Sequence, residues 1–113
     1  MYIEERPWGS FTILEDTDTY KTKRITVRPK QRLSYQSHEK RNELWIIVAG
    51  KAKITLDGID HILSYGENIV ILKHQKHRIE NIGESDVIFI EVQTGTYFGE
   101  DDIVRYSDDY KRS

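Results

Sequence analysis

Apolar and polar residues alternate along several short stretches of this chain, which is the pattern of β-strands with one buried face. Charged or polar residues alternate most clearly with Ile25 and Val27. A mostly apolar run begins at Leu44. No stretch of ten or more residues has helical periodicity, and only the tail after Glu100 leaves room for a helix. The pattern predicts strands over 21–28, 44–49, 51–56, 61–63, 69–72 and 86–93.

Turn-forming residues separate these stretches. Asp57-Gly58 stands between two alternating runs and predicts a hairpin, and Arg28-Pro29, Gly50, Gly66 and Gly83 mark further turns. Short strands at close spacing, without helical crossovers, predict an all-β fold, either an antiparallel sandwich or a barrel.

The composition is that of one small domain, which we expect to span residues 1–113. Its 17 basic and 19 acidic residues give a net charge of -2, which argues against nucleic acid or an anionic membrane as a partner. The absence of cysteine excludes disulfides and thiolate chemistry. Neither a signal peptide nor a run of membrane-spanning length is visible, so a cytoplasmic location is expected. Small size and apolar edge strands favour a homodimer.

Four residues between the predicted strands have side chains that suit a divalent metal: Gln36, His38, Glu43 and His77. Imidazole and carboxylate without thiolate is the ligand set of an open catalytic site. Taken alone, His38 would be interpreted as an exposed residue of a charged loop, and His77 could likewise lie at the surface. Strand parity places Glu43 on the apolar face of its strand, where a buried carboxylate needs a cation.

The spacing of these residues resembles that of the cupin family, whose first motif is G-x5-H-x-H-x3–4-E-x6-G and whose second is G-x5-P-x-G-x2-H-x3-N. Gln36 stands where the first histidine falls, and Leu72 and His74 replace the proline and glycine of the second motif. Gln-x-His is also found in phosphomannose isomerases. Further similarity to the C-terminal isomerase domain of bifunctional mannose-1-phosphate guanylyltransferase/mannose-6-phosphate isomerases lies at 6–9, 23–27, 43–45, 77–81 and 91–105.

This resemblance covers about residues 6–112 and implies a cupin double-stranded β-helix, an antiparallel jelly-roll barrel. It also implies metal-dependent interconversion of mannose 6-phosphate and fructose 6-phosphate. Gln36, His38, Glu43 and His77 would bind the metal, for which zinc is the first expectation and Mn, Co, Ni or Fe also fit. The guanylyltransferase activity is not implied, because the chain has no Gly-rich nucleotide loop.

The substrate of such an enzyme carries a phosphate, which an arginine can bind in a bidentate fork. The resemblance over 95–105 indicates Arg105 for this role, closing the mouth of the barrel. As a simpler alternative, Arg105 would be the ion-pair partner of an exposed acidic turn. Further candidate substrate contacts are Arg24, Arg41, Arg78, Glu91 and Gln93.

The sequence does not identify the residue that acts as general base. Glu91 and Lys53 are candidates by strand parity, and His74 is a candidate because it lies near His77. Two other functions also remain: a metal-binding cupin that acts on another small molecule, and a non-catalytic sugar-binding domain.

Overall fold

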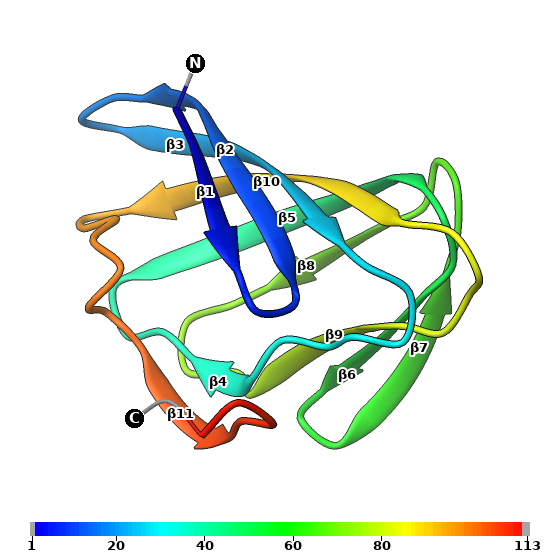
Figure 1. Ribbon diagram of the computed structural model, residues 1–113. Helices are drawn as coiled ribbons and strands as arrows, with labels where there is room; N and C mark the ends of the chain where they lie inside the picture. Colours follow the sequence, from blue (N-terminus) through cyan, green and yellow to red (C-terminus); the bar gives the residue numbers. More distant parts are fainter. Residues whose placement is uncertain (1, 112–113) are drawn as a thin grey trace.

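The computed structural model describes residues 2–111, which fold entirely into strands, turns and loops (Figure 1). None of these residues lies in a helix that could cross a membrane. The strands are β1 (Tyr2–Arg6), β2 (Gly9–Asp16), β3 (Tyr20–Val27), β4 (Tyr35–Ser37), β5 (Arg41–Ala49), β6 (Ala52–Leu56), β7 (Ile59–Leu63), β8 (Asn68–Ile71), β9 (His77–Asn81), β10 (Val87–Gly95) and β11 (Val104–Ser107).

The strands form two antiparallel sheets that face each other. The larger sheet has the order β1-β2-β3-β10-β5-β8, and the smaller one has the order β11-β4-β9-β6-β7. Consecutive strands of the chain repeatedly change sheets, as the chain from β3 to β4 to β5 does in Figure 1. The expected antiparallel all-β fold is therefore confirmed, and the cavity between the sheets is where the site must be sought.

The core lies between the sheets and consists mainly of alternate residues of β2, β3, β5, β6, β9 and β10. Val27, Ile47, Ile54, Ile79 and Phe89 are fully buried. Burying each such side chain contributes roughly 1.5–3 kcal/mol to folding. The alternation of the sequence thus fixes which face of each strand points inward.

Each of the six stretches read from the sequence contains or overlaps a strand of the structure. The hairpin at Asp57-Gly58 is confirmed, because these residues have φ of 47° and 83° and join β6 to β7. Gly50 also has a left-handed φ, of 84°, and a Cβ there would collide with the backbone of Asp86 and Val87. The tail after Glu100 contains no helix among its described residues. Instead, β11 pairs with β4, so the helical alternative is wrong.

Several inward-facing positions near one end of the sandwich are polar rather than apolar. Lys23 on β3, Glu43 on β5, His77 on β9 and Glu91 on β10 are each at most 4% exposed. Burying such groups is costly unless they are paired or bound to a ligand. Their convergence in the interior marks the candidate site.

Candidate functional site

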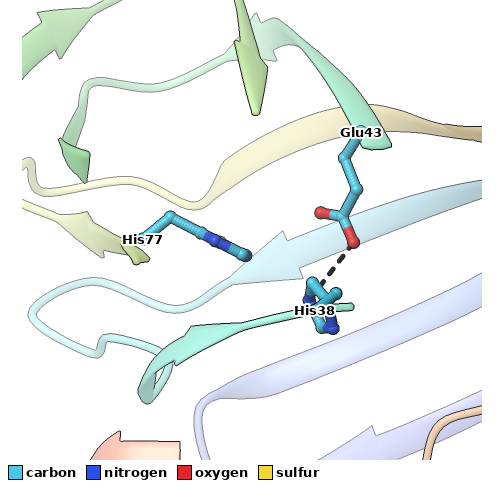
Figure 2. A group of neighbouring side chains, drawn as sticks. All are labelled: His38, Glu43 and His77. Carbon is cyan, nitrogen blue, oxygen red and sulfur yellow. Dashed lines mark ion pairs between the residues drawn. The ribbon is translucent and has the colours of Figure 1, made fainter. Parts of the chain in front are cut away.

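Three side chains from three segments meet inside the barrel. Glu43 projects from β5, His77 begins β9 and His38 follows β4, and Figure 2 shows them pointing into a shared space. One ligand atom from each residue lies within 4.8 Å of the others. Exposure of the three residues is 2–4%, so the group is shielded from water.

The two imidazoles are oriented by backbone carbonyl groups. Nδ1 of His38 donates to the carbonyl oxygen of Asp102 at 2.5 Å, and Nδ1 of His77 donates to that of Gln75 at 3.0 Å. Each ring is thereby held in the tautomer with a lone pair on Nε2, as in metal-binding histidines. Burial lowers the pKa of both histidines, so the rings are neutral at neutral pH.

The carboxylate of Glu43 is held from two sides. Its Oε1 accepts from the indole N–H of Trp45 at 2.9 Å, and its Oε2 accepts from Nε of Arg41 at 2.7 Å. Burial, the largest single influence, raises the pKa of Glu43, but the charge of Arg41, the neighbouring His38 and His77 and the hydrogen bond from Arg41 together outweigh it and lower that pKa to about 2. Glu43 is therefore ionised and rigid at all physiological pH values.

The contact between His38 and Glu43, dashed in Figure 2, joins Nε2 and Oε2 at 3.3 Å. It has the geometry of an ion pair, yet the lowered pKa of His38 makes the ring neutral. The contact therefore brings together two lone-pair atoms, and the guanidinium of Arg41 is the cation that lies beside both of them. Nε2 of His77 is also buried and finds no hydrogen-bond partner among the described residues. This donor set fits a divalent ion.

Gln36 lies next to this group, because its Cα is paired with that of His77 between β4 and β9. The side chain lines the same cavity, and its Nε2 donates to Oγ of Ser34 at 3.1 Å. This bond turns the amide nitrogen toward Ser34. The role of Gln36 as a fourth ligand stays a prediction.

Glu91 is a second buried carboxylate in the same cavity. Burial and the negative charge of Glu43 raise its pKa to about 7, although Lys23 and Arg41 act in the opposite direction. Gln93 donates to Oε1 of Glu91 at 3.2 Å. Glu91 can therefore both accept and release a proton near neutral pH.

The three candidate bases, Glu91, Lys53 and His74, differ in where they lie relative to the cavity. Lys53 extends from the outer side of β6 toward Glu80, at 3.5 Å, and His74 is exposed in the turn before β9. Neither lines the cavity, so neither side chain is placed to reach a substrate bound there. Glu91 is the candidate that remains.

Four cationic side chains line the cavity: Arg6, Lys23, Arg41 and Arg105. Arg24 and Arg78 do not. Arg24 lies on the exposed face of β3, and Arg78 bonds the carbonyl groups of Leu33 and Ser107 outside the barrel. These two arginines therefore do not face this cavity, and their assignment to the substrate stays a prediction that the cavity does not support. Gln93, which was also assigned to the substrate, instead supports Glu91.

The loop between β10 and β11, residues 96–103, closes one end of the cavity. Its Glu100 pairs with Nζ of Lys23 at 2.6 Å. The carboxylate of Asp102 accepts from the backbone N–H groups of Glu39 and Lys40 at 3.1 and 3.0 Å. Glu100 and Asp102 are thus bonded to the barrel. The alternative of a fully solvated acidic turn does not describe these two residues.

The altered second motif keeps a well-formed turn before His77. His74 has a φ of 71°, the left-handed conformation that the motif's usual glycine adopts without strain. Its backbone N–H donates to the carbonyl oxygen of His38 at 2.8 Å. The turn therefore connects the segments that carry two of the candidate ligands.

Lys23 and Glu100 belong to the cavity but were missed as site residues. Parity could have placed Lys23 correctly, since it shares a strand face with Ile25 and Val27. Glu100 had no comparable signal, because its position depends on how the loop folds back over the barrel.

A family model described as "Mannose-6-phosphate isomerase C-terminal" matches residues 3–108 of this chain. The chain is 48% identical over 108 residues to a mannose-1-phosphate guanylyltransferase of Salmonella montevideo. It is 42% identical over 108 residues to the alginate biosynthesis protein AlgA of Pseudomonas aeruginosa. Both alignments cover 96% of this chain, but only 23% and 22% of those proteins.

Two solved structures with the same architecture have much lower sequence identity. The capsular polysaccharide assembling protein CapF of Staphylococcus aureus superposes with a TM-score of 0.84 at 23% identity, over 94% of this chain and 34% of that one. An RmlC-like cupin from Shewanella frigidimarina gives 0.76 at 18% identity, over 88% and 86% of the two chains. These similarities show a cupin fold.

Proposed function

Because the chain belongs to the family of mannose-6-phosphate isomerase C-terminal domains, we propose that it is a metal-dependent isomerase that interconverts mannose 6-phosphate and fructose 6-phosphate. The observation that carries this proposal is one cavity lined by His38, Glu43 and His77 together with the protonatable Glu91. The relatives carry names that refer to guanylyltransferase or to alginate biosynthesis, and the chain spans 22–23% of their length. The proposal concerns the isomerase reaction alone.

The metal of this proposal is divalent, with zinc as the first candidate. His38, Glu43 and His77 would hold it, with Gln36 as a weaker fourth ligand, and a bound ion would polarise the sugar carbonyl as a Lewis acid. The protein side chains supply the rest of the site. Trp45 and Arg41 fix the Glu43 carboxylate, and two backbone carbonyl groups fix the imidazoles.

Glu91 is proposed to move the proton between C2 and C1 of the sugar. Isomerisation of an aldose to a ketose requires one group that removes a proton and returns it to the neighbouring carbon. A pKa of about 7 lets Glu91 do both at neutral pH. Its burial at 4% exposure keeps the transferred proton from exchanging freely with bulk water.

The direct test is a coupled assay for fructose 6-phosphate formed from mannose 6-phosphate. We expect turnover by the purified protein, loss of turnover after chelation and recovery on addition of a divalent ion. The family membership and the buried ligand group support this expectation. Absence of turnover from samples reconstituted with each of Zn, Mn, Co, Ni and Fe would favour a sugar-binding domain or a cupin with another substrate.

Arg105 is proposed to hold the substrate phosphate. It lines the cavity from β11, and its Cα is paired with that of Gln36. A charge-assisted hydrogen bond to phosphate is worth roughly 1.5–3 kcal/mol, so Arg105→Ala should lower kcat/KM by about ten- to a hundred-fold. Arg105→Lys should recover part of this loss, because it keeps the charge without the fork.

The control for Arg105 is metal content, which should be unchanged in both variants. The informative comparison is the preference for phosphorylated over unphosphorylated mannose, which should shrink in Arg105→Ala. An undiminished preference would assign the phosphate to Lys23 or Arg41, the more deeply buried cations of the cavity.

A homodimer is proposed through the outer face of the larger sheet. Cross-strand neighbours there are apolar: Leu44 on β5 is paired with Val70 on β8 and Val92 on β10, and Ile46 is paired with Ile90. Val70 is 52% exposed and the other four side chains are half-buried, so together they form an apolar surface of the kind that often marks an interface. Sedimentation equilibrium should give a dimer for the protein and a monomer for Val70→Asp. A parent protein that stays monomeric at micromolar concentration would contradict this prediction.

A further inference from the structure

The guanidinium group of Arg41 lies inside the group of candidate metal ligands. Its Nε donates to Oε2 of Glu43 at 2.7 Å, and its Nη2 lies 3.3 Å from Nε2 of His38. The residue is 6% exposed. Arg41 therefore contacts two of the three candidate ligand residues, and it contacts them from within the buried cavity.

A guanidinium can donate hydrogen bonds but cannot coordinate a metal ion. The lone pair on Nε2 of His38 can accept a hydrogen bond from Arg41 or bind a metal, but it cannot do both. The contact between Arg41 and His38 and the coordination of an ion by His38 are thus mutually exclusive. Glu43 differs, because its second oxygen and remaining lone pairs leave room for an ion.

We propose that Arg41 competes with a divalent ion for His38: its guanidinium holds His38 and Glu43 together, and an ion that binds there must displace Nη2 from His38. This inference rests on the proposed metal dependence. In the metal-free protein Arg41 supplies the positive charge that the buried Glu43 carboxylate requires. On metal binding, the guanidinium gives up His38, and the two positive charges then repel each other across the site.

A second feature of Arg41 supports displacement. Its Nη1 is buried and has no hydrogen-bond partner among the described residues. An unsatisfied buried donor destabilises this placement, so the guanidinium is held less firmly than its two other contacts suggest. Since Arg41 lines the cavity, it can turn toward the cavity without leaving the barrel.

The experiment measures metal affinity by chelator competition with Zn²⁺ and with Co²⁺, using the full chain without substrate. Arg41→Gln should bind each ion about ten- to a hundred-fold more tightly than the parent, since no charge-assisted contact must be broken. Arg28→Gln serves as the matched control, because Arg28 is an exposed arginine outside the cavity, and its affinity should equal that of the parent.

Thermal unfolding gives a second readout. The metal-free Arg41→Gln variant should unfold at a lower temperature than the metal-free parent, because Glu43 loses its buried counter-charge. Adding metal should raise the unfolding temperature of the variant by more than that of the parent. Unchanged or weaker metal binding in Arg41→Gln would overturn the proposal, and weaker binding would identify Arg41 as a group that orients Glu43 for the metal.

If Arg41→Gln does not fold, the metal affinity of Arg41→Lys tests the proposal instead. An ammonium cannot reach both His38 and Glu43 with the geometry of the fork, so tighter binding than in the parent is again expected. Equal or weaker binding in Arg41→Lys would overturn the proposal. If neither the parent nor either variant binds an ion, the proposed metal dependence fails as well. If the parent fails to bind but a variant binds, Arg41 blocks the site permanently, and the proposed displacement by an ion is overturned.

Discussion

Replacing His38 and His77 together by alanine is expected to abolish stoichiometric binding of a divalent ion. The two rings supply two of the three buried ligand atoms, and their tautomers present Nε2 lone pairs to the site. The remaining Glu43 is already paired with Arg41, so no strong site is left. Elemental analysis after gel filtration measures the metal content per chain.

The other two histidines of the chain provide a matched control. His61 and His74 are exposed and lie outside the cavity. His61→Ala combined with His74→Asn should keep the full metal content, asparagine being chosen because it tolerates the left-handed φ at position 74. A His38→Ala/His77→Ala protein that retains one ion per chain would show that the ligands have been wrongly assigned.

Glu91→Gln is expected to lower kcat by about a hundred- to ten-thousand-fold, the usual contribution of a general base. Metal content should be unchanged, because Glu91 is not among the grouped ligand atoms. Glutamine has nearly the same shape but cannot take up the proton. Full turnover by this variant would remove Glu91 from the proton transfer.

The same substitution should change how stability depends on pH in the chelated protein. The pKa of Glu91 rises on folding from 4.5 to about 7, so between these values the folded parent keeps a proton that the unfolded chain has lost. Parent stability therefore falls as pH rises through this window, by about 3 kcal/mol in total. Glu91→Gln lacks this titration.

The measurement is the free energy of unfolding of both proteins in urea at pH 4 and pH 8. The difference between variant and parent should shift in favour of the variant by about 3 kcal/mol between the two values. The titration of Glu43, whose pKa is lowered, lies mostly below pH 4.5 and is shared by both proteins. Parallel stability curves would mean that Glu91 ionises normally.

Strand parity correctly predicted that several site residues face the interior. The alternation placed Glu43 with Trp45 and Ile47, and Glu91 with Phe89, and each of these side chains faces the interior. Parity succeeds here because a strand with one buried face must turn every second residue inward. For the same reason Arg24 faces outward, whereas its neighbour Lys23 enters the cavity.

Local sequence patterns could not predict the contacts made by loops and edge strands. β1 and β2 carry many polar residues, and β4 and β11 are short, so their alternation is weak. The pairing of Glu100 with Lys23 joins residues far apart in the chain. The position of Arg41 between His38 and Glu43 depends on its side-chain conformation, which the sequence does not specify.

The most direct test of the account is to measure metal content and mannose 6-phosphate isomerisation on the same samples, across a series of partial chelations. We expect about one divalent ion per chain when the site is full, and a rate of fructose 6-phosphate formation that rises in proportion to occupancy. A fully loaded protein without turnover, or turnover that persists after the metal has been removed, would contradict it.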